Sequence, residues 1–184
     1  MKEDHAEPHV SVRTNRETYS FVLEEKVIGR EEDKRAIIEL LLESNVEDNV
    51  SVIPIVGLGK TTLAKYVFND KDVEKYFELK MWVCIFDPFE LEIIVKNILA
   101  SANDNTSQNL KLEQLQIRLR EKIHNKKYLL VLDDVWNEDR EKWLELKDLL
   151  MGDSKGSKII ITTRSRLVAE ITKTVSPYFL KGLC

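Results

Sequence analysis

The sequence predicts an α/β domain built on a doubly wound, mostly parallel sheet with helices on both faces. Short apolar runs that end in glycine, aspartate or threonine alternate along the chain with longer segments of helical periodicity. With 184 residues the chain has the length of one domain and is large enough to bury a sizeable core. Its 43% apolar and 33% charged residues are typical of a globular protein in water.

The expected elements are defined by hydrophobic periodicity and by the turns between them. A first helix begins near Glu31 and ends before the polar segment 45–49. Apolar, β-branched runs predict strands at 50–56, 79–85, 128–132, 158–161 and 178–180. Apolar residues at helical spacing predict helices at 61–68, 91–102, 112–123, 142–150 and 166–171. In the helix 91–102 the inward-facing residues are expected to be Ile93, Ile94, Ile98 and Leu99.

Composition restricts the classes of function and divides the chain in two. Residues 1–25 are polar and aperiodic, which predicts a linker or tail, and 26–184 form the expected domain. The net charge of -4 gives no electrostatic footprint for nucleic acid, so we do not expect nucleic acid as a partner. Cys84 and Cys184 form no disulfide framework, and Cys84 lies in an apolar run that predicts a buried thiol. Without a signal sequence or an apolar run long enough to cross a bilayer, we expect a cytoplasmic location.

A phosphate-binding loop follows the expected strand 50–56. Gly59, Lys60 and Thr61 complete the second half of the pattern of a glycine, four residues and then Gly-Lys-Ser/Thr. In a strand–turn–helix, backbone N–H groups and the helix dipole hold the anion, and Lys60 reaches the β- and γ-phosphates. Thr61 would offer its hydroxyl to Mg²⁺. A chance match is the competing interpretation, and the position between a strand and a helix argues against it. The expected nucleotide-binding residues of the loop are Gly57, Gly59, Lys60, Thr61 and Thr62.

This loop is three residues shorter than the pattern requires. The position five before Gly59 is Pro54, and the nearest upstream glycine is Gly57. Either the turn is too tight and lacks backbone donors for the β-phosphate, or the strand unravels so that 54–56 fill the loop. The second outcome would place a proline and two β-branched residues where glycine freedom is needed. Both outcomes predict reduced nucleotide affinity.

Two acidic residues end the most apolar strand. Asp133 and Asp134 follow the run 128–132 at the carboxyl edge of the expected sheet, where ligands of open α/β sheets bind. Asp133 would hold Mg²⁺ and Asp134 could activate a water molecule. The competing interpretation is a pair of solvated loop acids. The Gly-Lys-Thr-Thr run that lies 73 residues upstream favours the magnesium site.

An arginine ends the next expected strand. Arg164 follows Thr162 and Thr163, where a guanidinium can sense the γ-phosphate or offset charge that develops during hydrolysis. A surface cation is the competing interpretation, and Arg166 nearby prevents a unique assignment.

These motifs together resemble the nucleotide-binding part of the NB-ARC domain of plant disease-resistance proteins, which are immune receptors with leucine-rich repeats. The resemblance covers roughly residues 17–184, and its motifs occur in the family order. They read VIGREEDK, IVGLGKTTLAKYVFND, WVCIFDPFE, KKYLLVLDDVW, GSKIIITTRS and YFLKGL. Trp136, after Asp133-Asp134-Val135, is similar to the coiled-coil subclass. Phe86 departs from the family, which often has a small polar residue there.

The resemblance implies a P-loop NTPase fold that binds ADP or ATP with Mg²⁺. Val27 and Ile28 resemble the segment that contacts adenine through its main chain. Arg30 resembles a nucleotide contact, or it caps the following helix; the sequence does not separate these roles. Trp82 and Phe89 match core positions. The helical ARC subdomains and the leucine-rich repeats of the family are absent from this chain, which is expected to be a truncated NB-ARC domain. Implied partners are those domains and immune signalling proteins.

Three functions follow from these observations. The first is a defence-signalling switch that holds ADP at rest and ATP when active, with at most slow hydrolysis as a reset. The second is a P-loop ATPase with substantial turnover, against which no acceptor-substrate pocket can be identified. The third is a degenerate interaction module with little nucleotide, which the short loop favours. Turnover separates the second from the first, and nucleotide occupancy separates the third from both.

Overall fold

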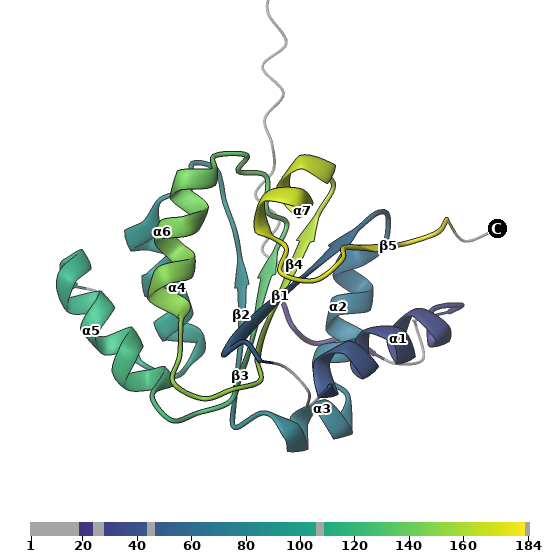
Figure 1. Cartoon of the computed structure of the whole chain (residues 1–184), viewed down its shortest axis with the longest axis horizontal. Helices are drawn as coiled ribbons and strands as arrows, with labels where there is room; N and C mark the ends of the chain where they lie inside the picture. Colours follow the sequence, from purple (N-terminus) through teal and green to yellow (C-terminus); the bar gives the residue numbers. More distant parts are fainter. Residues whose placement is uncertain (1–18, 24–27, 44–46, 106–108, 183–184) are drawn as a thin grey trace, which may run out of the picture.

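A computed structural model describes residues 19–23, 28–43, 47–105 and 109–182, and it has three layers (Figure 1). The middle layer is a five-stranded sheet in the order β2-β3-β4-β1-β5, in which every pair of neighbouring strands is parallel. The strands are β1 Val50–Val56, β2 Leu79–Cys84, β3 Tyr128–Asp133, β4 Ser157–Thr163 and β5 Tyr178–Phe179. The predicted α/β class and the parallel, doubly wound sheet are confirmed.

Seven helices within the described residues cover the two faces of this sheet (Figure 1). Helices α1 Glu31–Leu42, α2 Lys60–Phe68 and α3 Lys71–Tyr76 pack on one face. Helices α4 Leu91–Ser101, α5 Leu112–Ile123, α6 Arg140–Leu150 and α7 Arg166–Thr172 pack on the other. None of the described helices is both long and apolar enough to cross a membrane.

The alternation of side chains along each strand builds a separate hydrophobic core on each face. Leu129 and Val131 of β3 belong to the core beneath α1, α2 and α3, whereas Leu130 and Leu132 belong to the core beneath α4 to α7. Successive side chains of a strand point to opposite faces, so a strand covered on both sides must be apolar throughout. All six residues of β3 are buried, which explains why the five that precede Asp133 form a continuous apolar run.

Three expectations about local structure are wrong. Helix α3 was not expected; it has six residues, of which Val73 alone is buried, so it carries almost no periodic signal. Its N-cap is Asp70, whose side chain accepts a hydrogen bond from the N–H of Asp72. In α4, Ile93 is 48% exposed, and Val95 is buried in the inward position instead. Cys84 is half-buried. Most of the expected tail 1–25, Val27 and Cys184 lie outside the described residues.

Strand β1 keeps its full length in spite of Pro54. Seven Cα pairs join β1 to β4, and Pro54 lies opposite Ile161. The carbonyls of Val52 and Val56 accept hydrogen bonds from the segment 174–180, so even-numbered residues of β1 direct their polar groups to that side. By the same alternation, the position where Pro54 lacks an N–H faces away from β4. The strand therefore does not unravel, and the loop after it is short.

Candidate functional site

The loop between β1 and α2 consists of three residues, Gly57, Leu58 and Gly59. The two glycines have φ of +131° and +79°, values that residues with a side chain rarely adopt. Gly57 also has a close neighbour, because a Cβ placed there would lie 2.9 Å from the Cβ of Leu180. Of the two outcomes that the sequence left open, the structure has the tight turn. The loop reverses direction within three residues and leaves Leu58 exposed at its tip.

Lys60 is the first residue of α2 and is buried. Its Nζ lies 4.0 Å from Oδ1 of Asp134. Burial lowers the pKa of Lys60; the charges of Asp134 and Asp133 oppose that shift, and Arg164 adds to it. The ammonium thus lies among charged groups at the end of the helix where unpaired N–H groups attract anions.

Thr61 and Asp133 meet next to Lys60. The Thr61 hydroxyl donates a hydrogen bond of 2.8 Å to Oδ1 of Asp133, which is fully buried. The same carboxylate oxygen accepts a 2.5 Å bond from the hydroxyl of Thr162 on β4. Strand β4 lies between β3 and β1 in the sheet. Thr162 of β4 therefore lies between Asp133, at the end of β3, and the loop that follows β1. A hydroxyl and a carboxylate oxygen in contact are hard oxygen donors of the kind that Mg²⁺ prefers, so this pair fits the expected magnesium site.

Asp134 has a different environment from Asp133. It has φ of +61°, in the left-handed region, and its N–H donates a 2.8 Å hydrogen bond to the hydroxyl of Thr162. Its side chain is 43% exposed, so its carboxylate faces water at the edge of the sheet. The positive φ is what turns this side chain out of line with the strand that precedes it.

The two arginines after β4 are held by different aromatic rings. Arg164 is exposed, and its Cζ lies 5.9 Å from the centre of the Trp136 ring. Arg166 lies over the ring of Phe179 on β5, at 5.3 Å. Both distances are within the range of cation–π contacts. The charge of Arg164 also lowers the pKa of Lys60, so this arginine acts on the ammonium of the loop.

The segment expected at the adenine is only partly described. Val27 lies outside the described residues, and Ile28 is 80% exposed. Thr62 is exposed on the first turn of α2. Arg30 is the N-cap residue of α1, but its side chain makes no capping hydrogen bond. Its guanidinium instead donates to the carbonyl oxygens of Leu58 and Lys181.

Three residues at this edge of the sheet were missed by sequence reasoning. Thr162 joins Asp133 and Asp134, and a threonine directly after the predicted strand 158–161 is a usable signal for it. Leu180 and Lys181 approach the loop from more than a hundred residues away along the chain. No pattern in the sequence indicates that approach, because it depends on β5 adding to the sheet beside β1.

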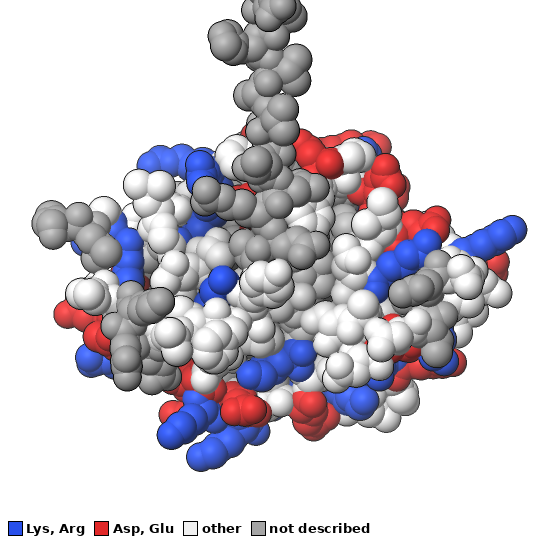
Figure 2. Space-filling model, turned by 180° about the vertical axis from the view of Figure 1, so that it is seen from behind, with Lys and Arg blue, Asp and Glu red and all other residues white. Residues whose placement is uncertain are grey.

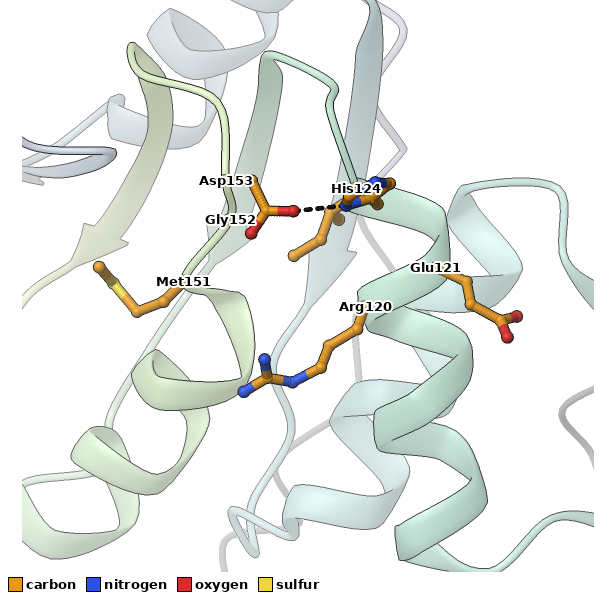
Figure 3. Close-up of a pocket in the computed structure, with 7 residues that line it drawn as sticks. Arg120, Glu121, His124, Met151, Gly152 and Asp153 are labelled. Carbon is orange, nitrogen blue, oxygen red and sulfur yellow. Dashed lines mark hydrogen bonds and ion pairs between the residues drawn. The ribbon is translucent and has the colours of Figure 1, made fainter.

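A cavity in the described part of the chain lies away from this site. It measures about 450 Å³ and is found where α5 and α6 end, toward the amino ends of β3 and β4 (Figure 3). His124 and Asp153 interact across it, and Arg120 extends into the space between the helices. From behind, acidic and basic side chains are interspersed around the rim of the molecule rather than gathered in one stripe (Figure 2).

Comparisons with known proteins agree with this arrangement. The family model of the NB-ARC domain matches residues 30–181. Disease resistance protein RGA2 of Solanum bulbocastanum is 41% identical over 174 residues, which cover 91% of this chain and 18% of that protein. Disease resistance protein RPP13 of Arabidopsis thaliana is 35% identical over 167 residues, which cover 86% of this chain and 20% of that protein. The chain thus spans about a fifth of the length of these curated relatives.

The matched region contains every element from α1 to β5, including the loop, Asp133 and Arg164. Because the match extends over far more than half of the sequence, the chain belongs to the NB-ARC family.

Proposed function

We propose that this chain is the ADP- or ATP-binding switch module of a plant immune receptor that acts in defence, with nucleotide affinity reduced by its short loop. Membership of the NB-ARC family implies nucleotide binding. The observation that carries the proposal is the contact of Thr61 with Asp133, which brings the two expected magnesium ligands together beside Lys60.

Each residue of the site has a role in this proposal. Lys60 and the N–H groups at the start of α2 bind the phosphates, and Gly57, Gly59 and Thr62 complete the loop. Thr61 and Asp133 would hold Mg²⁺, which when bound offsets the charge of the β- and γ-phosphates. Arg164 senses the γ-phosphate, and Asp134 orients a water molecule for hydrolysis that is slow at most. Ile28 and Val27 would contact the adenine.

The short loop supports the reduced affinity. A loop of the usual length wraps the β-phosphate with several backbone N–H groups. Here β1 continues to Val56 and α2 begins at Lys60, which leaves three residues for that task. Leu180 packs against Gly57, so the loop cannot widen on that side without moving β5. The helix N-terminus and Lys60 are unaffected by the missing residues and retain part of the binding energy.

The relatives supply the context of the module. Both RGA2 and RPP13 are named as disease resistance proteins. We infer that the chain works within a protein of that kind in the cytoplasm, with ARC and leucine-rich-repeat domains and immune signalling proteins as partners.

Calorimetric titration with ADP and with ATP tests the proposal. Three chains are compared: the natural chain, one in which three inserted residues restore a GIGGLGKTT loop, and the natural chain with Lys60→Ala. We expect the restored chain to bind at least about tenfold more tightly than the natural chain, which corresponds to about 1.4 kcal/mol. The natural chain should in turn exceed Lys60→Ala. Equal affinities of the natural and restored chains would contradict the claim of reduced affinity.

A second function, an interaction module without nucleotide, is favoured by the same packing of Leu180 against the loop. It predicts that the natural chain binds no more tightly than Lys60→Ala while the restored chain binds. Absence of binding by all three chains would reject the nucleotide switch altogether. Turnover of ATP at rates typical of enzymes would instead indicate a P-loop ATPase.

The magnesium site is tested by Thr61→Val, with Thr61→Ser as the matched control that keeps the hydroxyl. We expect Mg²⁺ to raise the affinity for ADP in the natural chain and in Thr61→Ser, but not in Thr61→Val. Thr61→Val should also lower the free energy of unfolding by about 1–3 kcal/mol, because Asp133 is buried and loses a donor. An undiminished effect of Mg²⁺ in Thr61→Val would remove Thr61 from the site.

A further inference from the structure

Arg30 is a buried arginine whose donors are directed to the protein chain. The residue is 6% exposed. Its Nη1 donates to Oδ2 of Asp33 at 3.0 Å and to the carbonyl oxygen of Lys181 at 2.9 Å. Its Nη2 donates to the carbonyl oxygen of Leu58 at 3.1 Å, in the middle of the phosphate loop. A guanidinium has five N–H donors, two of them on Nη1, so both donors of Nη1 are engaged.

The segment 178–181, which Arg30 contacts through the carbonyl of Lys181, is also hydrogen-bonded to the residue before the loop. The N–H of Leu180 donates a 2.8 Å hydrogen bond to the carbonyl of Val56, the last residue before the loop. The hydroxyl of Tyr178 donates a 2.6 Å bond to Oδ1 of Asp33, whose other oxygen accepts from Arg30. Arg30 therefore joins three parts of the chain, which are the loop at Leu58, the start of α1 and the segment 178–181.

The space beside Arg30 is unfavourable for phosphate. A cavity of about 370 Å³ opens there, lined by Gly29 and Arg30, by Glu31, Glu32 and Asp33 from the first turn of α1, and by Lys181 and Gly182. The three carboxylates outnumber the two cations, Arg30 and Lys181, and Arg30 is already paired with Asp33, so the lining disfavours the entry of an anion. The phosphate-binding groups Lys60 and Thr61 lie on α2 beside Asp133 and Asp134 instead.

We propose that Arg30 is a positioning residue that ties the shortened loop to the segment 178–181, and that it does not itself contact the nucleotide. A loop of three residues makes few contacts of its own, and the guanidinium fixes the carbonyl at its tip in one orientation. The peptide groups of Leu58 and Gly59 are held through that carbonyl, and with them the N–H groups that would face a phosphate. The effect of these hydrogen bonds on ligand binding rests on the proposed function. Their effect on the position of the loop does not depend on it.

Hydrogen exchange of the ligand-free full chain, followed by NMR, tests the tie without any nucleotide. Two amides report on it, Leu180, which is bonded to Val56, and Leu63, which is bonded to the carbonyl of Gly59. Glu78, bonded to Lys127 at the opposite edge of the sheet, is the reference amide. Arg30→Gln should accelerate exchange of Leu180 and Leu63 by about tenfold, because charge-assisted hydrogen bonds to a buried group are lost. Glu78 should be unchanged.

Three further variants separate the role of these hydrogen bonds from that of charge and from a general loss of stability. Arg35→Gln, at an exposed position of the same helix, should change none of the three amides. Arg30→Lys keeps the charge but not the planar fork, so it should not restore the natural exchange of Leu180 and Leu63. Asp33→Asn, which leaves Arg30 in place, should accelerate the same two amides by a smaller factor. Its effect should not add to that of Arg30→Gln, because the two residues act in one network.

The outcomes decide the proposal and are separate from those of nucleotide binding. Unchanged exchange in Arg30→Gln, equal acceleration of all three amides, or full rescue by Arg30→Lys would each overturn it. If ADP affinity falls in Arg30→Gln while exchange of the ligand-free chain is unchanged, Arg30 is a ligand contact and the proposal is wrong. If no chain binds ADP, the proposed function fails, and the exchange rates still show whether Arg30 holds the loop.

Discussion

Three cations with little exposure, on α2, at the N-cap of α1 and on α1, each lie beside a carboxylate. Lys60 faces Asp134, Arg30 contacts Asp33, and Lys34 lies 2.9 Å from Asp70. Burial of an unpaired charge is costly, so these pairs are a condition for placing the cations inside. The pair of Lys60 is the loosest of the three, at 4.0 Å, and its carboxylate is the most exposed. A phosphate could therefore replace Asp134 as the partner of Lys60 at little cost.

The pair of Lys34 and Asp70 makes stability depend on pH in the acid range. Burial opposes ionisation of Asp70, but the hydrogen bond from Lys34 and the N–H of Asp72 outweigh it and lower the pKa. A carboxyl whose pKa is lowered by folding stabilises the fold at pH values above 3.8, its pKa in the unfolded chain. This contribution is lost as the pH falls through the lower pKa of the folded state.

We therefore expect Lys34→Gln to raise the pKa of Asp70 and to weaken the dependence of unfolding free energy on pH below about pH 4. The loss of stability at neutral pH should be at most about 1 kcal/mol. Urea unfolding across a pH series and NMR titration of the Asp70 carboxyl measure the two effects. Lys75→Gln, at an exposed position of α3, is the matched control and should leave both unchanged.

At the scale of elements, β1 is the strand that sets the length of the loop. Its pairing with β4 over seven residues fixes Val56 opposite Thr163 and so fixes where the loop can begin. Proline in a central strand is normally excluded because it cannot donate to the ladder. Pro54 is tolerated because β5 has two residues only and pairs with Ile55 and Val56, so the strand is nearly an edge at position 54.

Two substitutions one residue apart test this account. Pro54→Val should cost no more than about 1 kcal/mol, mainly because the unfolded chain gains freedom. Ile53→Pro should cost about 3 kcal/mol or more, because Ile53 lies opposite Ile160 and its N–H is directed toward β4. Urea denaturation of both variants gives the comparison. A similar cost at the two positions would mean that the direction of the N–H groups does not explain the proline.

At the scale of the whole molecule, the order of strands assembles the site. β4 is inserted between β1 and β3, so the loop after β1 and the acids after β3 lie on either side of Thr162. All the parallel strands end at the same edge, which collects groups from positions 57 to 181 of the chain. The two hydrophobic cores hold this edge in place from both faces.

Residues of the core beneath α4 to α7 that lie far from the site should contribute to global stability. Leu119 of α5 is fully buried, whereas Ile117 on the same helix is 54% exposed. We expect Leu119→Ala to lower the free energy of unfolding by about 2–5 kcal/mol, through lost burial and a residual cavity. Ile117→Ala should stay within about 0.5 kcal/mol. Thermal and chemical unfolding measure both; an equal loss would mean that the two positions are packed alike.

The sequence by itself determined the class of fold, the order of all elements except α3, and the family. Continuous apolar runs such as 128–132 and the helical periodicity of Leu112–Ile123 are local consequences of burial, so they can be recognised along the chain. The same holds for Lys60, Thr61 and Asp133, whose positions at the ends of elements predict that they converge. Helix α3 was not predicted because six residues make too few helical turns for a hydrophobic period to be recognised.

Only the tertiary structure decided how the short loop is formed and what holds it. Whether Pro54 stays in the strand depends on which neighbour its missing N–H faces, and that depends on the place of β5 in the sheet. Whether Arg30 caps a helix or reaches the loop depends on Leu58 and Lys181 lying on either side of it. Contacts between residues far apart in the chain follow from the packing of whole elements, which local sequence patterns do not encode.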